Sequence, residues 1–186
     1  MQKKKLAGVN RLLKTIGEPP LLNEEDYSLS HEAQLASTQI DETTAKVLSS
    51  GFKFNTVKSF SLTPDLNQYI AIPPNILVID FGDTALTIND GMVYNRDTFS
   101  FIHTSAITVK LIYNEDFDYL PAVVQEYILA EASYIFQRDS INDPSTNSEL
   151  LRVKAEANRD LKVWHINQTK ANGKDSKFDR TTNPTR

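Results

Sequence analysis

The sequence predicts an α+β protein: a helical bundle of about four helices, an antiparallel β insertion and a flexible C-terminal arm. Three observations predict this class. Apolar residues recur at helical spacing near both ends of the chain, alternating apolar residues and turn residues fill the middle, and the last residues show no periodicity. The predicted boundaries are 1–51 and 114–170 for the bundle, 52–113 for the β insertion and 171–186 for an extended arm.

Composition limits the function classes. The 186 residues, 40% of them hydrophobic, suffice for one domain with a sizeable core. The net charge of −4 argues against a broad phosphate-binding face, which is usually basic. The lack of cysteine excludes disulfides and thiolate metal ligands. No apolar run approaches the roughly 18 residues of a membrane span, and no signal-peptide core follows the basic start. We expect a soluble protein without an export signal and without membrane association.

The first helix is predicted by an apolar stripe that ends at Gly17 and Pro19-Pro20, which offer a left-handed cap and a helix stop. A polar linker, 23–28, follows, and a second helix is expected from an N-cap at Ser30 to Gly51. Its inner stripe consists of small residues, so it packs closely against a neighbour, either in its own fold or in another subunit. The two stripes contain Leu6, Val9, Leu13 and Ile16, and then Ala33, Ala36, Ile40, Thr44 and Val47.

The middle of the chain has the period of two that is typical of strands. Strands are predicted at 52–54, 57–62, 76–80, 85–88, 92–94, 98–102 and 106–113, the last with the cleanest alternation. Pro64 and Pro73-Pro74 place the stretch around them at an edge or in a loop. Asn89-Asp90-Gly91 predicts a hairpin turn because these residues tolerate positive φ.

Two long helices are predicted to complete the bundle. The first begins around Leu120-Pro121, and its inner face is apolar apart from one carboxylate, Glu131. The second is expected to begin with a capping box formed by Thr146 and Glu149. Their inner faces contain Val124, Tyr127, Ile128, Glu131 and Ile135, and then Leu150, Val153, Ala157, Leu161 and Trp164.

Candidate catalytic and metal-ligating groups are weak. His31, His103 and His165 lie in three different elements without metal-ligand spacing. A cluster of Glu115, Asp116 and Asp118 could bind a metal, but acidic residues also gather at helix starts because the helix dipole stabilises them. Asp80, Asp83 and Asp90 lack the pattern of a calcium loop and are interpreted as turn formers. No nucleophile elbow or phosphate-binding glycine loop is present, so we expect no enzyme activity and no cofactor.

The C-terminal tail is the segment with a charge bias. From Lys170 onward it holds five basic and two acidic residues, a net charge of 5 − 2 = +3. Such a tail on an acidic body binds nucleic acid or an acidic protein surface, or is only a solvated end.

Two segments resemble a known family. The residues Val9-Asn10, Leu12-Leu13 and 16–20 are similar to the opening helix and stop of tail tubular protein A, the head-to-tail adaptor of autographivirus-type short-tailed phages. A second stretch runs from Val109 through Phe117-Asp118, Leu120-Pro121 and Tyr127-Ile128 to Ala132. Weaker similarity lies at 51–55, where the family tends to have tryptophan in place of Phe52, and at 91–94. The resemblance covers residues 6 to 165, and the tail is not part of it.

The resemblance implies a non-enzymatic virion protein at the head-tail junction, assembled in the host cytoplasm. Its members form a homo-oligomeric ring, typically of twelve copies, between the portal protein and the tail nozzle protein, tail tubular protein B. The ring surrounds the channel through which the genome DNA passes without sequence-specific binding, and it contributes to the surface where tail fibres dock. The C-terminal arm of the family reaches toward the portal.

Combining this resemblance with the residues gives candidate contact sites. The portal-interface candidates are Lys174, Lys177, Phe178, Arg180 and Arg186, with Phe178 as the anchor because it is the only aromatic residue in a polar tail. The subunit-interface candidates are Ala33, Ala36, Ile40, Asp90 and Met92. Two alternatives stay open: a nucleic-acid-binding module that uses the basic tail, and a metal-dependent hydrolase that uses Glu115, Asp116 and Asp118.

Overall fold

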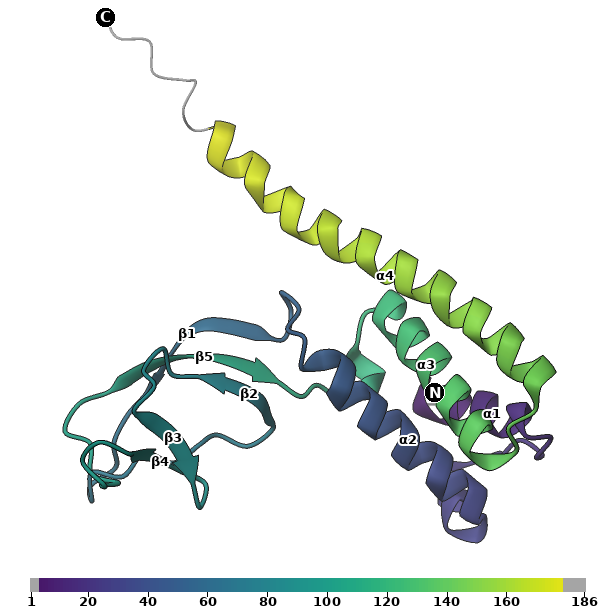
Figure 1. Cartoon of the computed structure of the whole chain (residues 1–186), viewed down its shortest axis with the longest axis horizontal. Helices are drawn as coiled ribbons and strands as arrows, with labels where there is room; N and C mark the ends of the chain where they lie inside the picture. The colour runs from purple at the N-terminus through teal and green to yellow at the C-terminus, as the bar shows by residue number, and fades with distance from the viewer. Residues whose placement is uncertain (1–3, 179–186) are drawn as a thin grey trace, which may run out of the picture. The chain divides into compact units, whose positions relative to one another are not determined.

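The computed structural model describes residues 4–178, and within this range the side chains of all residues except Glu24, Ser28, Leu29 and 169–178. The described chain forms two compact units (Figure 1). The boundaries between them lie after Val47 and after Glu115. The first and last parts of the chain form a helical unit, and residues 48–115 form a β unit. The predicted α+β class is therefore confirmed.

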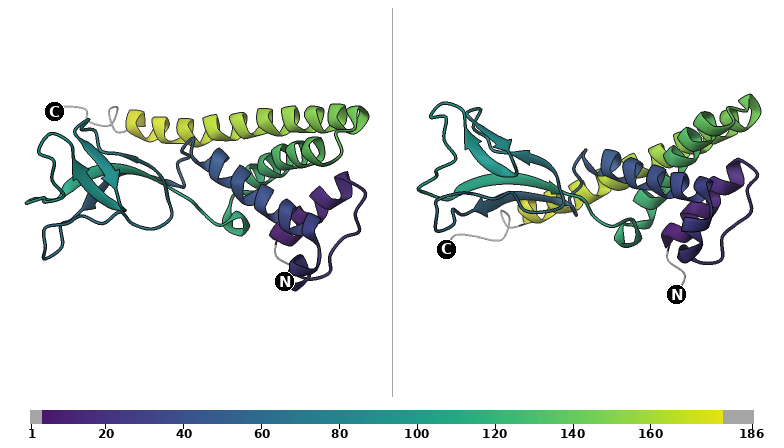
Figure 2. Two further views of the ribbon diagram at one scale, coloured as in Figure 1. Left: turned by 60° about the horizontal axis from the view of Figure 1, so that its bottom comes forward. Right: turned by 90° about the horizontal axis from the view of Figure 1, so that it is seen from below.

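The helical unit contains α1 (Lys4–Thr15), α2 (His31–Leu48), α3 (Ala122–Ser140) and α4 (Pro144–Phe178). Two short 3₁₀ helices, η1 (Glu24–Leu29) and η2 (Phe117–Tyr119), lie before α2 and α3. In this unit α3 is central, because α1 and α4 both pack against it (Figure 2). Most members of the predicted inner stripes are buried, among them Leu6, Val9, Leu13, Ala33, Ala36, Ile40, Val124 and Ile128. Leu12, Ala132 and Phe136 are buried although the stripes did not include them, whereas the predicted Ile16, Tyr127 and Ile135 are half-buried.

Several predicted helix boundaries are confirmed. Gly17 has the positive φ of 82° that a left-handed cap requires, and α1 ends just before it. The Ser30 Oγ accepts a 3.2 Å hydrogen bond from the N–H of Ala33, so Ser30 caps α2. Gly51, with φ 77°, follows the end of α2. In each case the signal is local, because one capping side chain begins the helix or one glycine with a positive φ follows its end.

Two local predictions are wrong. The expected polar linker contains η1, because Asn23 and Asp26 form a capping box there. The capping box predicted at Thr146 is displaced: α4 begins at Pro144, and the Asp143 carboxylate accepts a 2.7 Å hydrogen bond from the N–H of Thr146. That hydrogen bond lowers the pKa of Asp143.

The β unit contains a three-stranded antiparallel sheet in the order β1 (Thr56–Leu62), β5 (Ile107–Tyr113), β2 (Ile76–Asp80). A hairpin of β3 (Leu86–Asn89) and β4 (Met92–Asn95) lies beside it, with its turn at Asp90-Gly91 as predicted. Residues 70–72 run along the other edge of β4, where the N–H of Val93 donates to the carbonyl of Ile70.

Two predicted strands are absent from the β unit. Residues 52–54 form a turn, which the buried Asn55 stabilises by accepting a 2.7 Å hydrogen bond from the N–H of Phe52. Its amide donates to the carbonyls of Leu48 and Tyr113, so one side chain joins the end of α2 to the end of β5. Residues 98–102 form a loop with a single bridge between Asn95 and Ser100. Asparagine side chains decided both conformations, since Asn55 binds the turn at 52–54 and Asn95 binds the N–H groups of Asp97 and Thr98. A pattern of apolar residues does not encode such hydrogen bonds.

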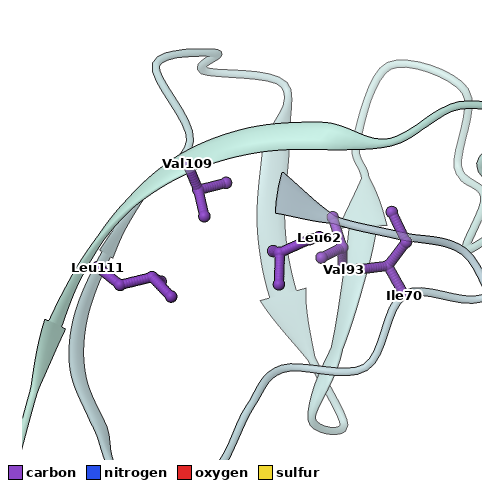
Figure 3. Packing of buried hydrophobic residues seen from close by; sticks show 5 residues of the cluster. All are labelled: Leu62, Ile70, Val93, Val109 and Leu111. Carbon is purple, nitrogen blue, oxygen red and sulfur yellow. The ribbon is translucent and has the colours of Figure 1, made fainter. Parts of the chain in front are cut away.

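The β unit has its own hydrophobic core. Figure 3 shows Leu62 of β1, Val109 and Leu111 of β5, Val93 of β4 and Ile70, all buried, converging between the sheet and the hairpin. The opposite face of the sheet carries exposed Lys110 on β5 and Asp80 on β2, which are register partners. The sheet therefore has one apolar face on the core and one more polar face, which also holds Val78 and the buried Ile112.

The predicted extended arm requires a correction. Residues 171–178 continue α4, which begins at Pro144 and runs to Phe178. After Pro144 the helix contains no further proline, and its one glycine does not end it. Gly173 lies inside this helix at the modest cost that an interior glycine carries. Arg180 and Arg186 lie outside the described residues.

Candidate functional site

Exposed apolar side chains gather in two neighbouring loops of the β unit. Leu66 is fully exposed, and Phe99 is 82% exposed. The loops lie next to each other because the N–H of His103 donates a 2.9 Å hydrogen bond to the carbonyl of Gln68. Both are rigidly built: the Asp65 carboxylate accepts from the N–H groups of Asn67 and Tyr69.

Phe99 stands in a strained conformation. Its φ is 52°, in the left-handed region that a bulky residue without a compensating contact rarely adopts. The Asn95 side chain holds this loop by accepting hydrogen bonds from the N–H groups of Asp97 and Thr98. The aromatic ring thus faces solvent at an energetic cost, which points to a role outside the stability of the isolated chain.

We expect Phe99→Asn to stabilise the β unit by about 1 kcal/mol, because asparagine tolerates positive φ and the exposed ring contributes little burial. Thermal or urea unfolding of the whole chain measures this. The matched control is Phe101→Asn, which should destabilise, since that ring is half-buried and packs on Tyr94 at 4.8 Å between centroids. A loss of stability in Phe99→Asn would contradict the strain argument.

The outer side of α4 carries a second group of exposed apolar residues. At about 100° per residue, one side of the helix holds the aliphatic side chains of Leu151, Val163 and Ile166 together with the basic side chains of Arg159 and Lys162. All five are exposed, whereas the opposite side buries Ala157 and Leu161. We name these five residues the α4 outer face. Aliphatic and cationic groups thus lie on the same exposed side of the helix.

A buried carboxylate joins three helices of the unit. Glu131 on α3 is the one carboxylate on the inner face, and its Oε2 lies 2.8 Å from the Nζ of Lys154 on α4, without the alignment of a hydrogen bond. Its Oε1 lies 3.5 Å from the Nζ of Lys46 on α2. Burial raises the pKa of the neighbouring Tyr127 hydroxyl, and the charge of Glu131 raises it further. The arrangement is structural: it fixes the side of α3 that faces both other helices.

The small-residue stripe of α2 is not a surface. Ala33, Ala36 and Ile40 are fully buried in the core of the subunit itself, where the Cδ1 of Ile40 lies against α1 at Gly8. Of the two possibilities that the sequence left open, packing in the chain's own fold is the one observed. The prediction that these three residues contact another subunit is therefore corrected, because a side chain without solvent exposure has no contact area left.

The other predicted contact residues are differently placed. Asp90 is exposed in the turn between β3 and β4, and Met92 is half-buried at the start of β4. Lys174, Lys177 and Phe178 lie on the last turns of α4. The α4 residues belong to the helical unit, and the β3–β4 turn belongs to the β unit.

The acidic cluster has structural partners. The Asp116 carboxylate accepts from the N–H of Asp118 and caps η2, and the Asp118 carboxylate accepts a 2.8 Å hydrogen bond from the N–H of Lys5 in α1. Among residues 4–178 no group of three or more potential ligands lies close enough to bind a metal ion. His103 is buried, with its Nε2 3.1 Å from the carbonyl of Val93.

The sequence did not predict the exposed loop residues or the α4 outer face. A signal exists for the latter, because Leu151, Val163 and Ile166 do not fit the inner stripe of the helix. For Phe99 there is none, since its exposure depends on the loop conformation. None of the helices within residues 4–178 has the length and apolar character of a membrane span.

The chain thus combines a helical unit and a β unit with a core of its own, and it exposes apolar side chains in two loops of the β unit and on α4. The chain matches the family model "Tail tubular protein" over residues 6–171, and it belongs to this family. It is therefore a structural protein of a phage virion tail. No curated protein matches the chain.

Proposed function

We propose that this tail protein is a ring-forming head-to-tail adaptor, which joins the portal to the tail nozzle and surrounds the DNA channel. The C-terminal part of α4 is proposed to contact the portal. The homo-oligomeric ring, the nozzle contact and the passage of DNA are parts of the same proposal, and the resemblance of two segments to the adaptor family supports them.

The observation that carries the proposal is the length of α4. It has 35 residues against 19 in α3, so it is about 50 Å long and its C-terminal part extends past the helix that supports it (Figure 1). Among the residues with described side chains, Leu161 is the last on α4 that is buried. A helix that leaves its own core and carries Lys174, Lys177 and Phe178 at its end is suited to reach another protein.

The two segments that resemble the adaptor family lie together in the structure. The first forms α1 and its stop, and the second runs through β5 and η2 into α3. The part of the second that lies in the helical unit contacts the first, because α1 packs against α3 and the N–H of Lys5 binds Asp118 in η2. A match of two sequence segments that pack on each other supports a shared architecture more than two separate matches would.

The test uses the whole chain and a variant that ends at Gln168, mixed with portal particles of the same phage and analysed by sedimentation. We expect the whole chain to join the portal in stoichiometric amounts. We expect the shortened chain, and Phe178→Ala to a smaller degree, to bind at least about tenfold more weakly, since interfaces depend on a few aromatic and basic anchors.

Undiminished binding by the shortened chain would exclude the C-terminal part of α4 as the contact. A whole chain that does not bind portal particles, but binds duplex DNA with strong salt dependence, would favour the nucleic-acid-binding alternative. Circular dichroism of the shortened chain should retain the signal of the remaining helices, since the helical core ends before residue 168.

A further inference from the structure

The outer side of α2 differs from that of α4 in charge. Leu35 and Glu42, seven residues apart, lie on the same side of α2, and both are exposed. Leu22, in the segment before η1, is also exposed. We name the exposed residues of 18–42, which do not include the buried Ala33, Ala36 and Ile40, the α2 outer face. Between Lys14 and Lys46 the chain has no lysine or arginine but seven acidic residues: Glu18, Glu24, Glu25, Asp26, Glu32, Asp41 and Glu42. Of these, Asp41 is paired with Lys5 of α1, whose Nζ lies 2.7 Å from its Oδ2.

The α4 outer face has the opposite charge, because its exposed Arg159 and Lys162 are both cationic. From Arg159 to Phe178 the helix carries five basic residues, Arg159, Lys162, Lys170, Lys174 and Lys177, against two acidic ones, Asp160 and Asp175. Its exposed aliphatic residues, Val163 and Ile166, lie among these charges, and Leu151 lies two turns or more before them. Each of the two faces therefore combines exposed aliphatic side chains with one dominant sign of charge.

The two faces lie on different sides of the same unit. In Figure 2, α4 runs along one side of α3, whereas η1 and the N-terminal end of α2 lie on the side away from α4. One subunit therefore cannot pair these faces with each other. A second copy can, and because the faces differ, the contact is heterologous and can repeat from copy to copy.

We propose that the α2 outer face of one copy binds the α4 outer face of the next, and that this is the subunit contact of the assembly. The proposal rests on the proposed ring and deepens it by naming the two surfaces. Charge complementarity selects the pair and orients it, and the aliphatic side chains supply burial at its centre. Duplex DNA is the poorer partner for the α4 outer face, since a phosphate backbone gives Leu151, Val163 and Ile166 nothing apolar to contact.

The test is a charge swap in the full-length chain. The α2 variant carries Thr38→Lys and Glu42→Lys, and the α4 variant carries Arg159→Glu and Lys162→Glu; all four residues are exposed. The control carries Lys53→Glu and Lys58→Glu, two exposed residues of the β unit. Sedimentation velocity over a concentration series measures self-association of each variant alone and of the two mixed in equal amounts.

We expect the wild type and the control to associate at the same concentrations. Each face variant alone should need at least about tenfold more protein, because like charges then meet. The equal mixture should regain association, since the intact α4 outer face of one variant meets the intact α2 outer face of the other. In the other contact of the mixture, the α2 outer face of the α2 variant, which now carries lysines, meets the α4 outer face of the α4 variant, which now carries glutamates. Opposite charges therefore meet there as well.

Three outcomes overturn the proposal: a wild type that stays monomeric throughout, face variants that associate like the wild type, or a mixture that is not restored. Binding of duplex DNA by the wild type that the α4 variant loses, without any change in self-association, would assign the α4 outer face to nucleic acid instead. Failure of the adaptor role itself is seen separately, as absence of co-sedimentation with portal particles.

Discussion

Replacing Lys154 with methionine is expected to destabilise the protein by about 2–3 kcal/mol, because it leaves the buried carboxylate of Glu131 without its nearest cation. Lys46 remains, but its Nζ is 3.5 Å away and its side chain is 69% exposed, so it compensates weakly. Methionine preserves most of the packing of the aliphatic chain. Urea unfolding, followed by circular dichroism, measures the change in the free energy of unfolding.

The control for this prediction is Arg152→Met on the same helix. Arg152 also pairs with carboxylates, those of Glu149 and Glu156, but all three side chains are solvent-exposed, so we expect a much smaller change. The double variant Glu131→Leu with Lys154→Met should recover most of the lost stability, since replacing a whole buried ion pair with apolar side chains is often nearly neutral. A double variant as unstable as Lys154→Met would show that packing of Lys154, including its contact with the Tyr134 ring, matters more than charge.

The second large effect is expected in the β unit. Leu111→Ala should cost about 3 kcal/mol, because Leu111 is fully buried in the cluster with Leu62, Ile70, Val93 and Val109, and truncation leaves a cavity there. Hydrogen exchange should lose protection in β5, β1 and β2, while amides of α3 keep theirs, since the cluster contains residues of the β unit only.

The matched control is Lys110→Ala, next to Leu111 in β5 but exposed on the polar face of the sheet. We expect it to leave stability and exchange almost unchanged. Equal loss of protection in α3 and β5 after Leu111→Ala would mean that the two units unfold as one. Local loss would mean that an assembly contact on one unit can be altered without unfolding the other, which is the condition for interpreting the charge-swap variants.

The surfaces have a common energetic feature. Phe99 keeps an exposed aromatic ring at positive φ, and the α4 outer face exposes three aliphatic side chains. Neither contributes to the stability of the isolated subunit, and Phe99 lowers it. In the assembly proposed above, a contact with another protein would bury these groups.

The sequence by itself determined the elements whose signals are local. The stop at Gly17, the cap at Ser30, the hairpin turn at Asp90-Gly91 and the alternation of β5 each depend on residues within one or two turns of chain, and the structure has all four. The α+β class followed from these elements. The family resemblance also came from the sequence alone, and the family match over residues 6–171 confirms it.

Only the tertiary structure decided which sides of those elements are exposed. An apolar stripe shows that a side chain will be buried, but not by which partner, so Ala33, Ala36 and Ile40 could be placed in the subunit core only once α1 was seen against them. The same holds for Asn55, whose partners are Leu48 and Tyr113, and for Phe99, whose exposure follows from a loop fixed by Asn95. Periodicity records the environment of one element, whereas exposure depends on what packs against it from elsewhere in the chain.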